Sequence, residues 1–196
     1  GEFVVQTDTE VLVAPAAELV AYPEFVPVAQ LPAEVLTFLL PSRYCESDRF
    51  GDMAWEIVGQ QQPGYAQIQA LSDWVRQHVR NVPLSSTDPV SAVEVNQRRE
   101  GVCRDLAHML IALSRALCIP ARLVVGFVHG LAPMDIHAWC EVYLAGRWWV
   151  FDPAFAPEHD ARIAVARGRD AADVAVYNQY GPLLLPTDMT VEVTRL

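Results

Sequence analysis

Residues 101–117 read Gly-Val-Cys-Arg-Asp-Leu-Ala-His-Met-Leu-Ile-Ala-Leu-Ser-Arg-Ala-Leu. The leucines of this segment recur at helical spacing, which predicts a helix over 103–117 with one apolar face. Gly101 interrupts the pattern before the helix, and Ile119-Pro120 ends it. The helix is therefore expected to start at Cys103, where unpaired backbone N–H groups and the positive end of the helix dipole stabilise a thiolate.

The segments that follow this helix have the pattern of β-strands. They are short and rich in β-branched and aromatic residues: 122–129, 137–144 and 147–152. Ala145-Gly146 between the last two is typical of a hairpin turn. Upstream, apolar periodicity and helix-start signals predict helices over three ranges: 33–40, 65–79 and 91–99. Helices followed by antiparallel strands indicate an α+β fold rather than alternating βαβ units.

The N-terminal region has a different composition. Residues Glu2 to Val13 are rich in Val and Thr and predict a strand, and prolines punctuate an extended segment from Pro15 to Pro32. The chain starts at Gly1, with neither a Met nor a leader that has charged and apolar regions, so we expect it to be a fragment of a longer protein.

Composition and charge exclude several classes of partner. The chain has 196 residues, of which 52% are hydrophobic and 19% charged, as expected of a globular protein with a sizeable core. The formal net charge of −10 disfavours nucleic acids and anionic membranes, because phosphate groups are bound by clustered Lys and Arg. No apolar run approaches the roughly 18 residues that span a bilayer. The cytoplasm is the default location on these grounds.

Two further residues can do chemistry together with Cys103. On a strand, His137, Trp139 and Glu141 share one face, and Cys140 lies on the other. Asp152 ends a strand whose two faces are both apolar, so we expect that strand to be central and buried. A buried carboxylate needs a partner. His137 on the neighbouring strand is the functional partner, and an Arg or a helix N-terminus is the structural alternative.

Each of these three residues has an ordinary structural interpretation when it is taken alone. A lone Cys is usually a small buried hydrophobe, and a lone strand His is usually held in the core by one hydrogen bond. In the order Cys, His, Asp they indicate nucleophilic attack on an amide: Cys103 attacks, His137 moves the proton, and Asp152 orients the imidazole.

Four ordered segments resemble motifs of the transglutaminase-like family, within the papain-like superfamily of thiol enzymes: Gly101 to His108, Ile119 to Phe127, His137 to Tyr143 and Gly146 to Pro153. The resemblance implies a fold in which the helix of the nucleophile packs on an antiparallel sheet. It also implies catalysis by Cys103, His137 and Asp152 on a peptide or protein amide, without a cofactor.

The same resemblance suggests supporting residues and a division of the chain. Papain-like enzymes use a Gln shortly before the Cys as an oxyanion donor, and Gln97 is the candidate equivalent here. A solvated Gln is the default among the polar residues of its helix, so the backbone N–H of Cys103 is the preferred donor. Asp105 and Trp139 are further supporting candidates. We expect residues 1–62 to form an extended, β and helical segment packed on the core, and residues 63–196 to form the catalytic core.

Other reactive side chains are expected to be structural. His108 is five residues from Cys103 and off its helix face, and Cys118 is expected to be inert core. Asp170 and Asp173 are interpreted as solvated helix-start or salt-bridge residues. The four cysteines lack paired spacing, so we expect reduced thiols.

Three functional alternatives to amide hydrolysis stay open. The first is a crosslinking transglutaminase, in which an amine rather than water takes the acyl group. The second is a binding module that keeps the fold without turnover. The third is a metal site drawn from Cys103, His108, His137, Cys140 and Asp152, which strand alternation disfavours because it separates His137 from Cys140.

Overall fold

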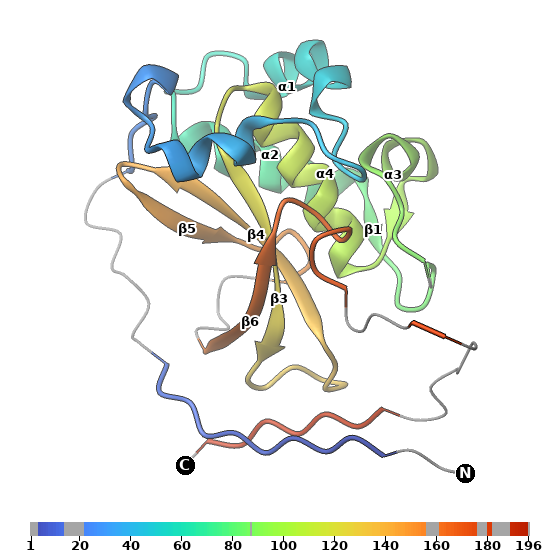
Figure 1. The fold of residues 1–196 in the computed structure, drawn as a ribbon. Helices are drawn as coiled ribbons and strands as arrows, with labels where there is room; N and C mark the ends of the chain where they lie inside the picture. The colour runs from blue at the N-terminus through green and yellow to red at the C-terminus, as the bar shows by residue number, and fades with distance from the viewer. Residues whose placement is uncertain are drawn as a thin grey trace.

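The computed structural model describes residues 4–13, 22–86, 88–155, 161–175, 180–181 and 189–195. In these ranges, four α-helices gather on one side of a four-stranded antiparallel sheet, which confirms the predicted α+β class (Figure 1). Within the same ranges, no helix has the length and apolar character needed to cross a membrane.

The sheet has the strand order β5-β4-β3-β6, and all of its neighbouring strands are antiparallel. Its strands are β3 (Ala121–Val128), β4 (His137–Leu144), β5 (Arg147–Phe151) and β6 (Arg162–Gly168). The sequence predicts the first three of these strands, and β6 was not predicted. Every residue of β4 is buried, so β4 is the interior strand that carries the most side chains into the core.

The expected central position of the strand before Asp152 was wrong, because β5 lies at an edge of the sheet. Its two tryptophans are partly covered by other means, and Val150 is exposed. The ring of Trp148 meets Tyr143 and Phe38 edge-on, and the guanidinium of Arg122 lies 3.9 Å from its ring centroid. Trp149 donates its indole N–H to the carbonyl of Leu144 at 3.0 Å. Aromatic side chains on both faces of a strand therefore need not mean two flanking strands.

The predicted leucine-rich helix is α4 (Cys103–Ala116), and it runs through the middle of the helical layer (Figure 1). Every residue from Asp105 to Arg115 is buried, so α4 is covered on all sides rather than along one apolar face. Its neighbours are the sheet and three helices: α1 (Gly51–Val58), α2 (Tyr65–His78) and α3 (Ala92–Arg98). The sequence predicts α2 and α3, whereas the short α1 was not predicted.

A buried arginine joins α4 to distant parts of the chain. The guanidinium of Arg115 donates to the carbonyl oxygens of Leu40, Ala121 and Arg169 and to the hydroxyl of Ser42, at 2.6–3.0 Å. Because a buried cation is costly unless it is hydrogen-bonded, these contacts are needed to keep Arg115 inside the fold.

The N-terminal region differs from the prediction in one element and agrees in another. Residues 4–13 form no strand in the described part of the chain, and their side chains are exposed, so their Val-rich pattern buries nothing. The short helix expected over 33–40 is a 3-10 helix, Ala33–Leu39. Its Val35, together with Leu31, packs against Tyr143 of the sheet.

A pair of short parallel strands precedes α4. β1 (Arg80–Asn81) pairs with β2 (Glu100–Gly101), and Val102 then occupies the N-cap position of the helix. The backbone N–H of Val102 donates to Asp105 Oδ2 at 3.1 Å. A Cβ at Gly101 would lie 2.7 Å from Cβ of Asp105, so only glycine leaves room for this carboxylate.

We predict that Gly101→Ala lowers the free energy of unfolding by about 1–3 kcal/mol, because the added methyl group overpacks Asp105 at the start of α4. Urea denaturation measures the change. Gly51→Ala is the matched control, since a Cβ at Gly51 meets nothing within 4 Å. Equal stability of the two variants would contradict this account of Gly101.

Candidate active site

The start of α4 brings Cys103 to the edge of the core. Cys103 is the first residue of the helix, as predicted, and its side chain is partly exposed while it packs against the buried cluster. The first N–H groups of a helix have no partner within the helix. The side chain of Cys103 is therefore partly open to solvent and lies at the helix end that carries the unpaired backbone N–H groups.

His137 and Asp152 meet where two neighbouring strands bring them together. β4 begins at His137, and Asp152 directly follows β5, the antiparallel neighbour of β4. His137 Nε2 lies 2.8 Å from Asp152 Oδ2. Both residues are buried, at 1% and 7% exposure, so this hydrogen bond is formed out of water.

The imidazole of His137 also interacts with Cys103. Because Nε2 faces Asp152, the other ring nitrogen, Nδ1, is left for the sulfur. Burial lowers the pKa of His137, but hydrogen bonds to Asp152 and Cys103 and the charges of both groups outweigh it and raise that pKa to about 9. The surroundings of His137 thus favour an imidazolium placed between a carboxylate and a sulfur.

The carboxylate of Asp152 is held on both oxygens. Oδ1 accepts the backbone N–H groups of Ala154 at 3.1 Å and Phe155 at 3.2 Å. Oδ2 accepts from His137 and, at 3.2 Å, from Arg162 of β6. Burial alone would raise the pKa of Asp152, but the hydrogen bonds and charges of His137 and Arg162 lower it.

A second arginine fixes the backbone around Asp152. Arg76 of α2 donates to the carbonyl oxygen of Asp152 at 3.0 Å and to that of Phe155 at 3.2 Å. The segment after β5 is thereby tied to the helical layer.

Aromatic rings enclose the imidazole. The ring of Phe155 meets His137 edge-on with centroids 4.9 Å apart, and the ring of Trp139 lies nearly parallel to it at 6.1 Å. Trp139 packs with Val124 on one face of the sheet, whereas Cys140 belongs to the main core on the other face. The predicted alternation along β4 is therefore confirmed.

Of the three supporting candidates, Asp105 and Trp139 lie near the reactive residues, and Gln97 is exposed on α3. Asp105 is fully buried and accepts from the Ser86 hydroxyl, from Arg104 Nε at 3.0 Å, and from the N–H of Val102. This network holds the first turn of α4 in place. Trp139 keeps a buried indole N–H for which no partner is found within the described ranges.

Some expectations for the other side chains were right. His108 is structural: its Nδ1 lies 3.0 Å from the carbonyl of Val90, and its Nε2 accepts the N–H of Ala171 at 3.2 Å. Burial lowers the pKa of His108, which is consistent with this neutral tautomer. All four cysteines are free, and Asp173 pairs with Arg169.

Other expectations were wrong. Cys118 is exposed rather than core, because it follows the end of α4 with a left-handed backbone, φ +59°. Asp170 is buried rather than solvated, and it accepts the N–H groups of Tyr44 and Ala172, both at 2.8 Å.

The described residues hold no group of three or more His, Cys, Asp or Glu side chains with the arrangement of a metal site. Cys140 lies on the opposite face of the sheet from Trp139, so the mixed ligand set considered above does not converge.

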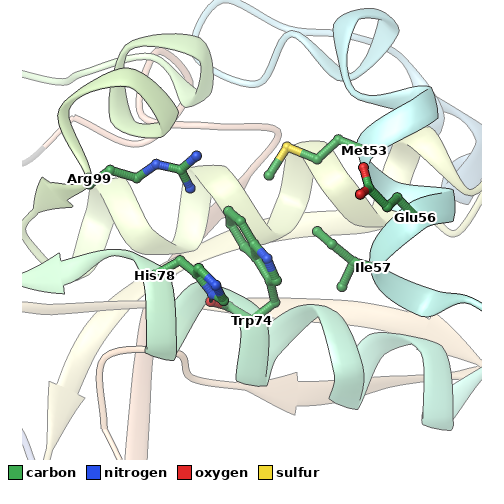
Figure 2. Close-up of a pocket in the computed structure, with 6 residues that line it drawn as sticks. All are labelled: Met53, Glu56, Ile57, Trp74, His78 and Arg99. Carbon is green, nitrogen blue, oxygen red and sulfur yellow. Dashed lines mark hydrogen bonds between the residues drawn. The ribbon is translucent and has the colours of Figure 1, made fainter.

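A pocket of about 480 Å³ lies on a different side of α2, between α1 and the end of α3 (Figure 2). Its lining residues are Met53, Glu56, Ile57, Trp74, His78 and Arg99. Trp74 and His78 each lie two residues from Arg76, which is roughly 200° around the helix, so the pocket faces away from Asp152.

Three residues around Asp152 had not been singled out from the sequence: Arg76, Phe155 and Arg162. Phe155 follows Asp152 by three positions and could have been considered as part of the turn. Arg76 lies off the apolar stripe of its predicted helix, and Arg162 belongs to β6, which was not predicted.

Comparisons with known proteins identify the family and agree with the fold. A family model described as the transglutaminase-like superfamily matches residues 51–153. A solved structure of a candidate cysteine protease from Cytophaga hutchinsonii has 40% sequence identity and a TM-score of 0.74, covering 79% of this chain and 54% of that chain.

Two curated relatives are uncharacterized mycobacterial proteins. The one from Mycobacterium leprae is 30% identical over 172 residues, covering 81% of this chain and 60% of the relative. The one from Mycobacterium tuberculosis is 37% identical over 105 residues, covering 46% of this chain and 33% of the relative. The chain thus spans between 33% and 60% of the length of these relatives. Because the family match extends over more than half of the 196 residues, the chain belongs to the transglutaminase-like superfamily.

Proposed function

We propose that this protein catalyses thiol-dependent acyl transfer on amide bonds, with hydrolysis of a peptide or carboxamide as the outcome. The observation that carries the proposal is the position of His137, whose Nε2 lies 2.8 Å from Asp152 Oδ2 and whose ring also interacts with Cys103. A nucleophile, a base and an orienting carboxylate within hydrogen-bond reach of one another are the arrangement that covalent amide chemistry needs.

The first half-reaction forms a thioester. The Cys103 thiolate attacks the amide carbon, and the carbonyl electrons move onto oxygen to give a tetrahedral oxyanion. The backbone N–H of Cys103 at the start of α4 is a suitable donor to that oxyanion, and Gln97 is a second candidate donor. His137 then gives its proton to the departing amine, and the C–N bond breaks.

The second half-reaction releases the acyl group. Neutral His137 takes a proton from water, the resulting hydroxide attacks the thioester, and the thiolate leaves, which restores the starting ion pair. Asp152 keeps the imidazole oriented through both steps, and the rings of Trp139 and Phe155 keep water away from its faces.

Hydrolysis and transamidation differ only in whether water or an amine reaches the thioester. The similarity to a candidate cysteine protease at 40% identity supports hydrolysis. A binding module without turnover would not need a buried His137–Asp152 pair beside a partly exposed thiol, because desolvating both groups is costly.

The first test of the proposal is selective alkylation. Burial raises the pKa of Cys45 and of Cys140, whereas Cys103 has the imidazolium of His137 beside it. We predict that iodoacetamide at about pH 6 labels Cys103 at least about tenfold faster than any other cysteine. Peptide mapping measures the rates, and the exposed Cys118 is the internal comparison.

The matched variant for this experiment is His137→Ala, which should remove the selectivity for Cys103. Labelling of Cys103 and Cys118 at equal rates in the parent protein would contradict the proposed thiolate.

A second test concerns Asp152. We predict that Asp152→Asn slows turnover by about 10⁴-fold, the size of effect known for the corresponding change in a serine-protease triad, while the near-isosteric amide leaves the fold intact. The folded-state pKa of His137 is raised to about 9, so the imidazolium is present below that pH and is lost as the pH rises through it. The alkaline limb of the rate profile should lie near pH 9 in the parent protein and at lower pH in Asp152→Asn.

The pH–rate profile of any peptide amide that the parent cleaves measures both effects, and circular dichroism checks the fold of the variant. Near-normal turnover of a folded Asp152→Asn protein would mean that Asp152 is structural only.

A further inference from the structure

Arg162 reaches the proposed catalytic residues from a strand outside the family match. It is the first residue of β6, whereas the matched range ends at residue 153. Its Nη2 lies 3.2 Å from Asp152 Oδ2, the same oxygen that lies 2.8 Å from His137 Nε2. The Arg162 side chain is only 13% exposed, so solvent screens this ion pair weakly.

The orientation of Asp152 does not depend on Arg162 alone. Its Oδ1 accepts the N–H groups of Ala154 and Phe155, and Arg76 holds its carbonyl oxygen. None of these contacts involves Arg162. What Arg162 adds to them is a second positive charge on the oxygen that faces the imidazole.

Two cations that share one carboxylate oxygen weaken each other's interaction with it. Among the residues that the structure describes, the charged and titratable groups around His137 and Asp152 are Cys103 from α4, Arg162 from β6 and, against the backbone of Asp152, Arg76 from α2. Of these, Arg162 is the cation that competes with His137 directly.

We propose that Arg162 is a positioning residue of this site: by sharing Oδ2 of Asp152 it limits how tightly the carboxylate holds the imidazolium proton of His137. A general acid that holds its proton too tightly delivers it slowly to a leaving amine. The catalytic consequence rests on the proposed function, whereas the charge balance among Arg162, Asp152 and His137 does not.

The test is an NMR titration of the His137 ring in the parent protein and in Arg162→Gln and Arg162→Met. Both variants remove the charge, and Met keeps much of the apolar stem. We predict that the midpoint, about 9 in the parent, rises by about one pH unit in each variant. Arg162→Lys, which keeps the charge, should restore a midpoint close to that of the parent.

Arg167→Gln is the matched control, because Arg167 lies on the same strand and pairs with Glu141 instead. It should leave the His137 midpoint unchanged. Circular dichroism and thermal unfolding show which variants are folded, and one folded neutral variant is enough to decide.

An unchanged or lowered midpoint in a folded neutral variant would overturn the proposal, as would an equal rise in Arg167→Gln. The outcome is separable from the proposed function. Unselective alkylation of Cys103 in the parent would contradict the proposed thiol chemistry without affecting the titration result. An unchanged His137 midpoint in the Arg162 variants would contradict the role of Arg162 without affecting the proposed thiol chemistry.

Discussion

Asp152 is the residue at which four parts of the chain meet. Its carboxylate contacts His137 of β4 and Arg162 of β6 and accepts two N–H groups from the turn after β5, while Arg76 of α2 donates to its backbone carbonyl oxygen. A buried carboxylate is costly unless each oxygen is hydrogen-bonded, so the contacts from these segments together offset the cost of burying Asp152. The geometry around His137 is therefore a consequence of how the sheet and the helices assemble, since a local motif alone could not hold it.

The start of α4 imposes the second constraint. Asp105 is fully buried and caps the helix through Val102, and Gly101 is the residue that leaves room for it. These contacts fix where the first turn of α4 begins, and hence where the sulfur of Cys103 lies relative to His137. A shift of one residue would turn Cys103 by about 100° around the helix and away from the imidazole.

Much of this arrangement could be predicted from the sequence because local periodicity determines it. The spacing of apolar residues predicts the helix that starts at Cys103, the strand that starts at His137 and the strand that Asp152 follows. Strand alternation correctly separates Trp139 from Cys140. The errors arise where tertiary context decides. β5 looks central because it carries apolar side chains on both faces, yet it lies at a sheet edge, where a 3-10 helix and the guanidinium of Arg122 pack against Trp148.

The remaining errors have similar causes. The Val-rich residues 4–13 have the composition of a strand but are exposed in the described structure. Cys118 has an apolar neighbourhood in sequence, but the left-handed turn after α4 exposes it. Arg162 gives no local signal, because its role comes only from the pairing of β6 with β3, which brings it to Asp152.

The central claim is that His137 forms one unit with Cys103 and Asp152. The most direct measurement is the pH titration of the His137 ring by NMR in the parent protein and in Cys103→Ala. We predict a midpoint near 9 in the parent and a lower midpoint in Cys103→Ala, because the hydrogen bond and charge of the sulfur no longer favour the imidazolium. The same midpoint in both proteins would show that Cys103 and His137 do not interact, and would contradict the account.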